Sequence, residues 1–247
     1  MRFIGEFAAR PLQAWLERFR SRHGLTSEAR PAAAPEPSPW DKAGDERLLL
    51  HVGCGPATLE HIPAAGFKHA AWREIRLDAD ASVGPDIVGT MTEMPAVPTA
   101  SVDAVFSSHG IEHLYWHDVP RALAEFRRVL VDEGFAVITC PDLQTAAELI
   151  AKGCLFETAY VSAAGPITPF DMVYSYRPFV EANPQWMSHH CGFTLDSLVG
   201  VLRESGFAKM YGFRRHGGFD LWVLASKSPR SDEQMAALAA DYFPPIG

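Results

Sequence analysis

The sequence predicts an α/β domain built around a seven-stranded, mostly parallel sheet with helices on both faces. Short apolar runs alternate with helical patterns after residue 44, which is typical of βαβ units. The first of these runs leads directly into a pair of glycines. Two β-rich runs near the end of the chain, separated by Gly217 and Gly218, predict a terminal antiparallel hairpin at the sheet edge.

The expected strands lie at residues 48–52, 74–77, 86–88, 102–107, 135–140, 208–213 and 219–225. A helix is expected over 119–130, where Leu123, Phe126 and Leu130 share one face. A second helix is expected over 194–205, with Thr194 as its N-cap and Gly206 as its C-cap.

The composition is that of an ordinary globular protein with one main domain, since 47% of the 247 residues are hydrophobic and 21% are charged. No run of about 18 apolar residues occurs, so no membrane span is expected. The net charge of -8 disfavours nucleic acid as a partner. Four cysteines without paired CxxC spacing, and a start without a secretory apolar segment, predict a cytoplasmic protein.

The chain divides into four expected parts. Residues 1–24 have the periodicity of an amphipathic helix, and 25–44 form a linker rich in proline and alanine. The main domain is expected over 45–230, followed by a C-terminal tail at 231–247. The N-terminal helix is expected to pack on the main domain or on a second subunit, which makes a homodimer through this helix one expectation; its arginines also leave a membrane-surface role open.

The glycine pair is the most informative local feature. Strand 48–52 runs into Gly53 and Gly55, which let the backbone approach a ligand closely. Position 58 holds Thr58 where a dinucleotide fingerprint requires a third glycine, so a diphosphate is disfavoured. Asp78 ends the second strand, where a carboxylate can accept hydrogen bonds from two ribose hydroxyls. A nucleoside without a diphosphate fits this pattern best.

Five segments then follow one another in a fixed order: His51-Val52-Gly53-Cys54-Gly55; Leu77-Asp78; Pro85 to Val88 before Glu93-Met94-Pro95; Ser101 to His109 through Glu112-His113-Leu114; and Arg128-Val129-Leu130 with Gly134-Phe135. With them, residues 48–142 resemble the class I S-adenosylmethionine-dependent methyltransferases of the small-molecule, type 11 kind. Met187 to Thr194 is similar to a stretch found in a subset of these proteins. The resemblance implies a Rossmann-like fold, methyltransferase activity and S-adenosylmethionine as cofactor.

The resemblance also implies which residues bind the cofactor: Gly53, Cys54, Gly55, Asp78, Met91, Thr92, Ser107 and His109. Gly53 and Gly55 are expected to border the methionine part, Asp78 to hold the ribose, and Met91 and Thr92 to lie near the adenine. Ser107 and His109 are expected at the mouth of the site. Many relatives carry an aspartate for the adenine amino group where this chain has Thr90, so adenine recognition is expected to be mainly apolar and by backbone groups.

Methyl transfer requires alignment of nucleophile, methyl and sulfur more than it requires a base. A histidine can nevertheless steer or remove a proton, because its pKa lies near neutrality. His189 and His109 are the expected catalytic residues, whereas His190 is expected at the surface. His109, His113 and His117 are spaced by four residues like metal ligands on a helix, but His109 is expected in a turn, so no metal ion is predicted.

Residues 153–190 are expected to form a lid-like insert at the carboxyl edge of the sheet, where ligands of open α/β folds bind. Its aromatic content favours a small apolar or aromatic acceptor, although each aromatic can equally serve only to pack the insert. Tyr174, Tyr176, Arg177 and His113 are the expected acceptor-binding residues, with Arg177 placed to pair with an anionic group.

The expected function is methyl transfer from S-adenosylmethionine to an oxygen or nitrogen of a small molecule. Three alternatives stay open: methylation of a protein or RNA, another group transfer from the same cofactor, and a non-catalytic partner or sensor that only binds the nucleoside.

Overall fold

The computed structural model describes residues 38–69, 71–215, 217 and 219–244. The chain divides into two units, Met1–Pro39 and Trp40–Gly247. The helix expected at 1–24, and the expected linker as far as residue 37, lie outside the described residues. All elements named below belong to the second unit.

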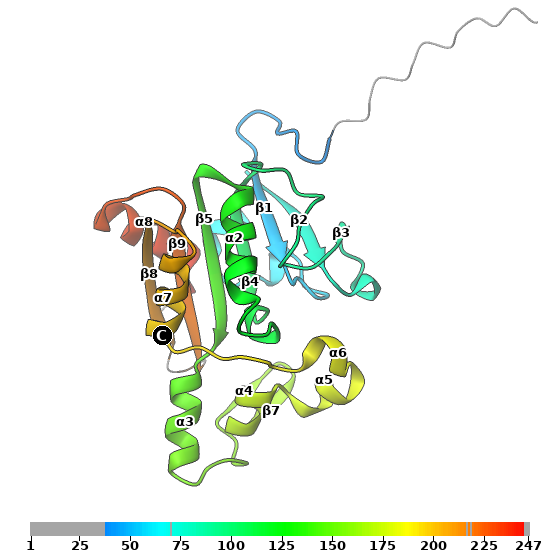
Figure 1. Ribbon diagram of the computed structural model, residues 1–247, viewed down its shortest axis with the longest axis vertical. Coiled ribbons are helices and arrows are strands. Elements are labelled where there is room, and N and C mark those ends of the chain that lie inside the picture. The colour runs from blue at the N-terminus through cyan, green and yellow to red at the C-terminus, as the bar shows by residue number, and fades with distance from the viewer. Residues whose placement is uncertain (1–37, 70, 216, 218, 245–247) are drawn as a thin grey trace, which may run out of the picture. The chain divides into compact units, whose positions relative to one another are not determined.

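A seven-stranded sheet with strand order β3-β2-β1-β4-β5-β9-β8 forms the centre of this unit (Figure 1). Neighbouring strands from β3 to β5 pair in parallel, whereas β9 runs antiparallel to both β5 and β8. This confirms the mostly parallel sheet with a terminal antiparallel pair. The strands are β1 (Arg47–Val52), β2 (Trp72–Asp78), β3 (Ile87–Val88), β4 (Val102–Ser108), β5 (Leu130–Pro141), β8 (Lys209–Arg215) and β9 (Asp220–Ser226).

The helices are α2 (Val119–Val129), α3 (Leu143–Ala151), α4 (Pro169–Tyr174), α5 (Arg177–Ala182), α6 (Pro184–Met187), α7 (Leu195–Glu204) and α8 (Asp232–Tyr242), with short 3-10 turns η1 (Leu59–His61), η2 (Ala65–Lys68), η3 (Ala81–Val83) and η4 (Ile111–His113). The predicted cap of α7 is present, because Thr194 accepts a hydrogen bond from the Ser197 N–H. Within the described residues, no helix is both long and apolar enough to cross a membrane.

Both faces of the sheet are covered, as predicted. On one face Leu123 of α2 and Leu198 of α7 join the apolar side chains of the strands. On the other face Phe67 of η2 packs with Met235 and Tyr242 of α8. Fully burying an apolar side chain of this size contributes about 1.5–3 kcal/mol, so both faces stabilise the unit.

The segment expected as a C-terminal tail contains α8, which is part of the core. Met235, Ala239 and Tyr242 lie on its buried side at helical spacing. The Tyr242 ring lies 4.7 Å, between centroids, from both Phe67 and Phe135. The buried stripe is narrow and partly alanine, which explains why the pattern is weak in the sequence.

The insert after β5 lies beyond the carboxyl ends of the parallel strands (Figure 1). It contains α3, the hairpin of β6 (Tyr160–Ser162) and β7 (Gly165–Ile167), and helices α4 to α6. Ala146, Ile167 and Met172 form a small core of its own. The insert as folded includes α3, before the expected start at residue 153, and its role as a lid stays a prediction.

Candidate active site

The site begins where the strand order reverses between β1 and β4, the position at which open α/β sheets bind ligands. Directly after β1, Gly53 and Gly55 adopt φ angles of 64° and 52°, a left-handed region that favours glycine. The N–H groups of Gly53 and Cys54 both donate to the carbonyl of Leu77, at 2.9 and 3.3 Å. The glycine turn is thus fixed to the end of β2.

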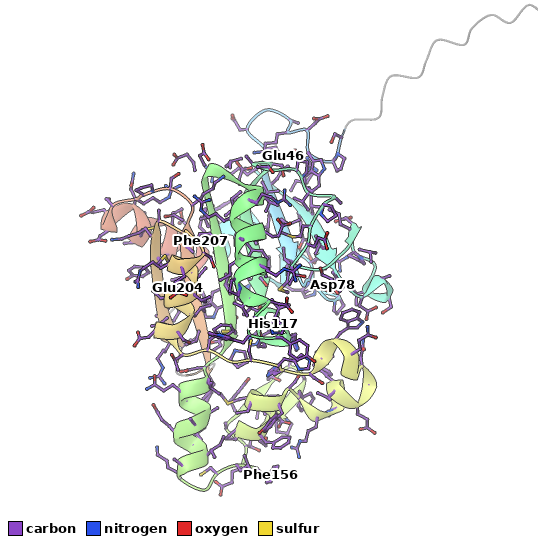
Figure 2. The ribbon with its side chains drawn as sticks, in the orientation of Figure 1. Glu46, Asp78, His117, Phe156, Glu204 and Phe207 are labelled. Carbon is purple, nitrogen blue, oxygen red and sulfur yellow. The ribbon has the colours of Figure 1, made fainter. Side chains whose placement is uncertain are left out.

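Asp78 holds the same turn through its side chain. Its Oδ2 accepts a hydrogen bond of 2.7 Å from the Gly55 N–H, and its Oδ1 accepts one of 2.9 Å from the Asp80 N–H. The residue is half-buried at the end of β2 (Figure 2). Each carboxylate oxygen has a further lone pair, so both can still accept hydrogen bonds from hydroxyl groups of a ligand.

Arg76 stabilises the glycine turn through hydrogen bonds to backbone carbonyls. Its guanidinium donates to the carbonyls of Gly55 at 2.6 Å, Ala57 at 3.0 Å and Gly84 at 2.8 Å. One side chain therefore joins the glycine turn to the loop after η3. The sequence gives no signal for this role, because a charged residue at a half-buried strand position does not by itself indicate its partners.

Met91 lies between the turns that follow β1 and β4. A Cβ on Gly53 would stand 3.5 Å from the Met91 Cε, and one on Gly110 would stand 3.2 Å from it. A Cβ at position 110 would therefore force the Met91 side chain to shift by a few tenths of an ångström. Thr92 is half-buried beside it, with its Oγ1 3.1 Å from that of Thr90.

Ser107 and His109, the two residues expected at the mouth of the site, differ in their solvent exposure. Ser107 is completely buried, and no described group forms a hydrogen bond with its hydroxyl. It therefore lies beneath Gly110 and not at an opening, because its side chain points into the packed face of β4. His109 has a left-handed backbone with φ of 51°, and 46% of its side chain is exposed.

Cys54 contributes backbone only. Its side chain is buried, and burial, the largest effect, raises the pKa of the thiol to about 11. Burial likewise raises the pKa of Cys191 to about 12. Neither thiol is ionised near neutral pH, so neither is a nucleophile there.

A buried carboxylate lies at the centre of the histidine cluster. The Glu112 side chain is 1% exposed, and neither of its oxygens accepts a hydrogen bond from a described group. Its Oε1 lies 3.3 Å from Nδ1 of His109 and 4.0 Å from Nε2 of His189. Burial opposes its ionised form, but the nearby histidines outweigh burial and hold the pKa of Glu112 below its usual value.

His189 and His113 face each other beside this carboxylate, with ring centroids 4.9 Å apart. Nδ1 of His189 lies 3.2 Å from the carbonyl oxygen of Met172, and Nδ1 of His113 lies 3.1 Å from that of Ser188. Burial, the largest effect, lowers the pKa of His189 below its ordinary value. His189 is therefore held neutral near pH 7, with its ring orientation fixed.

Backbone hydrogen bonds bring together two segments that are far apart in the sequence. The carbonyl of Glu112 accepts hydrogen bonds from the N–H groups of His190 and Cys191, at 2.9 and 3.2 Å. Leu143 N–H donates to the carbonyl of Phe193. The stretch 187–194, noted in the sequence, thus runs alongside the turn that follows β4.

Two pockets adjoin the cluster. One of about 220 Å³ is lined by Glu112, Pro141, Leu143, Met172, Val173, Tyr174, His189, His190, Cys191 and Gly192. The other, of about 340 Å³, is lined by His109, Tyr160, Val161, Ser162, Arg215, Gly217 and Asp220. Glu112 lines the first pocket and His109 the second, so one member of this carboxylate and imidazole pair borders each pocket.

Of the residues expected to bind the acceptor, Tyr174 lines the first pocket, whereas two others have roles inside the insert. Tyr176 donates its hydroxyl to the carbonyl of Ala164 at 3.1 Å. Arg177 pairs with Asp171, with 2.9 Å between Nε and Oδ1. Asp171 is fully buried, so the charge of Arg177 compensates it and is not reserved for an anionic acceptor.

The histidine spacing noted in the sequence does not correspond to one face of a helix. His117 is 79% exposed and lies beside Asp118, away from the cluster. Glu112, and not His117, lies at the centre of the histidine cluster. The spacing of the histidines alone does not indicate this. The signal available was a carboxylate three residues after His109 and adjacent to His113.

Comparison with known proteins is consistent with this geometry. Residues 50–138 match the family model described as a methyltransferase domain. None of the curated proteins matches the chain.

Among solved structures, a protein from Pyrococcus horikoshii is similar at 9% identity over 88% of this chain and 92% of its own, with a TM-score of 0.51. The CMeT domain of the citrinin polyketide synthase is similar at 11% identity and a TM-score of 0.50 over 77% of this chain, which spans only 48% of that structure. A 1,6-didemethyltoxoflavin-N1-methyltransferase from Burkholderia thailandensis, 17% identical, aligns over 92% of this chain and 94% of its own with a TM-score of 0.44. At such identities the first two likenesses show the fold.

The matched residues run from the end of β1 into β5 and include the glycine turn and Asp78, and the strand order and terminal antiparallel pair agree with the expected fold. Residues 50–138 thus form a methyltransferase domain, and this match together with the fold supports S-adenosylmethionine as the cofactor.

Proposed function

We propose that this methyltransferase transfers the methyl group to an oxygen or nitrogen atom of a small-molecule acceptor bound in the pocket beside Glu112 and His189. The bond between sulfur and methyl carbon breaks, its electron pair stays on sulfur, and the acceptor lone pair forms the new bond. S-adenosylhomocysteine and the methylated acceptor result. The proton of the acceptor leaves to a base, for which a neutral histidine is suited.

The environment of His189 is the observation that carries this proposal. Its side chain is 9% exposed and lines the pocket, and the carbonyl of Met172 fixes its Nδ1. A carbonyl only accepts hydrogen bonds, so Nδ1 carries the proton and Nε2 carries the lone pair. A basic nitrogen held in a sheltered pocket can orient or deprotonate a nucleophile.

The cofactor in this proposal lies along the turn after β1. Gly53 and Gly55 border its methionine part, and the free lone pairs of Asp78 accept hydrogen bonds from the ribose hydroxyls. Met91 and Thr92 contact the adenine. His109, at the end of β4, lies between cofactor and acceptor, since its Nδ1 is 3.3 Å from the carboxylate that lines the acceptor pocket.

The size of the pocket and the charge of the chain favour a small molecule over a macromolecule. A volume of about 220 Å³ accommodates only a compact group. The net charge of -8 disfavours RNA. Four free thiols fit the expected cytoplasmic location. A homodimer through the N-terminal helix stays an expectation.

The direct experiment incubates the full chain with methyl-labelled S-adenosylmethionine and a panel of phenols, carboxylic acids and amines. We expect label in at least one small molecule, linked through oxygen or nitrogen. A chain that binds the cofactor tightly yet labels only a protein or an RNA would contradict the proposed acceptor class.

A further inference from the structure

We propose that Glu112, His113 and His189 bind a divalent transition-metal ion. Each offers one ligand atom, and these atoms lie within 4.8 Å of one another. Glu112 and His113 belong to the turn after β4, and His189 comes from the segment that the carbonyl of Glu112 holds against this turn. The sequence gives no such prediction, because His189 is distant in the chain.

Glu112 is buried without a hydrogen-bond donor among the described residues. Its carboxylate is almost completely buried, and no described group donates a hydrogen bond to either oxygen. Burying a carboxylate is strongly unfavourable unless a cation or hydrogen bonds compensate it. Nδ1 of His109 lies 3.3 Å from Oε1 and Nε2 of His189 lies 4.0 Å from the same oxygen, and neither nitrogen forms a hydrogen bond with it. A metal ion there would compensate the carboxylate directly.

The imidazoles of His113 and His189 are both oriented by a backbone carbonyl. Nδ1 of each ring points to a backbone carbonyl, of Ser188 for His113 and of Met172 for His189. Each Nδ1 therefore carries the proton, and each Nε2 carries a free lone pair. Nε2 of His189 lies 4.0 Å from Oε1 of Glu112. Histidines that bind metal ions are held in this way, with the second nitrogen donating to a carbonyl or carboxylate.

The donor set indicates the class of metal. Two imidazoles and one carboxylate suit Zn²⁺, Mn²⁺, Fe²⁺ or Co²⁺, whereas Mg²⁺ prefers oxygen ligands alone. A tetrahedral ion with ligands at about 2.1 Å places them about 3.4 Å apart. The three ligand atoms would have to close by at most about 1.4 Å in pairs, which small rotations of the side chains can provide.

The site opens towards the acceptor pocket, because Glu112 and His189 both line it. Positions of the ion not taken by protein would face this pocket and could hold an oxygen or nitrogen of the acceptor. This role rests on the proposed function, while the binding of the ion does not. With the ion bound, His189 acts on the acceptor through the metal and not by taking its proton.

The test measures metal binding by the full chain, first stripped with a chelator and then titrated with Zn²⁺, Co²⁺, Mn²⁺ and Mg²⁺. We expect one equivalent of Zn²⁺ or Co²⁺, with a visible Co²⁺ spectrum of mixed nitrogen and oxygen ligation. Losing a group that only supports a ligand costs about 10–100-fold in affinity, so Glu112→Gln and His113→Asn should each lose at least about 100-fold. His117→Gln, a nearby exposed histidine, should bind like the wild type.

Thermal unfolding shows whether a variant that binds no ion is still folded. At a hundredfold excess over the dissociation constant, the ion should raise the melting temperature of the wild type by about 5–10 °C. Glu112→Gln should fold and show no such rise. Absence of binding in the wild type would overturn the inference, as would full binding by both Glu112→Gln and His113→Asn. Loss of binding in Cys191→Ser with retention in Glu112→Gln would overturn it too.

The two proposals fail separately. A chain that binds the ion as described but methylates no small molecule keeps the metal site and loses the proposed acceptor class. A chain that methylates a small molecule equally well when stripped of metal, and binds no ion, loses the metal site alone.

Discussion

The Gly55 N–H donates a hydrogen bond of 2.7 Å to Oδ2 of Asp78, joining residues that are 23 positions apart. The carboxylate that is proposed to hold the ribose thus also shapes the glycine turn that borders the methionine part. In this proposal, recognition of two parts of the cofactor would be coupled through one side chain.

Replacing Asp78 should weaken cofactor binding in proportion to the oxygens removed. We expect Asp78→Ala to reduce the affinity for S-adenosylhomocysteine by about 1.5–3 kcal/mol, because charge-assisted hydrogen bonds are lost in a sheltered site. Asp78→Asn keeps one acceptor oxygen and should lie between it and the wild type. Calorimetry measures both. Unchanged affinity in a folded Asp78→Ala chain would show that another carboxylate, Asp80 first, holds the ribose.

Arg76 should affect the affinity for the cofactor without contacting the cofactor. Arg76→Met removes hydrogen bonds to the carbonyls of Gly55, Ala57 and Gly84, so we expect about 1–3 kcal/mol less stability and a weaker cofactor complex. Arg121, exposed and paired with Asp118, provides the control as Arg121→Met. Denaturant unfolding and calorimetry distinguish them. Equal behaviour of the two variants would remove Arg76 from the support of the turn.

Asp171 should make the stability of the insert decrease at low pH. Burial opposes its ionised form, but hydrogen bonds from Thr168 and Arg177 outweigh burial and hold its pKa below the usual value. A depressed folded pKa means that its contribution is present at neutral pH and is lost as pH falls through that pKa. Asp171→Asn should therefore lose stability at pH 7 and show a smaller further loss below about pH 4. Asp132→Asn, at an exposed carboxylate, should follow the wild type at every pH. Parallel pH profiles of Asp171→Asn and wild type would contradict this account.

Gly66 should report whether α8 is part of the core. A Cβ at this position would lie 2.7 Å from the Asp241 carbonyl oxygen and from the Tyr242 ring. Gly66→Ala should therefore cost about 1–3 kcal/mol by overpacking. Gly200→Ala, inside α7 with open space around it, should be neutral or stabilising by up to about 1 kcal/mol. Chemical denaturation compares the two, and a neutral Gly66→Ala would mean that α8 is displaced at little cost.

The sheet could be predicted from the sequence because its buried strands are short, apolar and bounded by turns. Strand Leu48 to Val52 and the pair around Gly217 illustrate this, since local pattern and final position agree. Helix α8 could not be predicted with the same ease. Its buried side depends on contacts with Phe67 and Phe135, which are remote in the sequence.

The candidate site could be predicted only for residues whose position follows directly from the strand that precedes them. Gly53, Gly55 and Asp78 follow β1 and β2 and lie together as expected. The ion pair of Arg177 with the buried Asp171 could not be predicted, because the fold of the insert brings the two together, and acceptor binding by Arg177 stays a prediction. Glu112 was overlooked because its importance arises from burial among histidines of two segments.

Methyl transfer at the pocket beside His189 can be tested by comparing the wild type with His189→Ala. Methyl-deuterated S-adenosylmethionine is incubated with the wild type and with His189→Ala, and mass spectrometry follows label in the small acceptor while calorimetry follows cofactor binding. We predict that the wild type labels the acceptor, and that His189→Ala lowers turnover by about 10²-fold or more at nearly unchanged cofactor affinity. Full turnover by His189→Ala with every acceptor that the wild type uses would contradict the account.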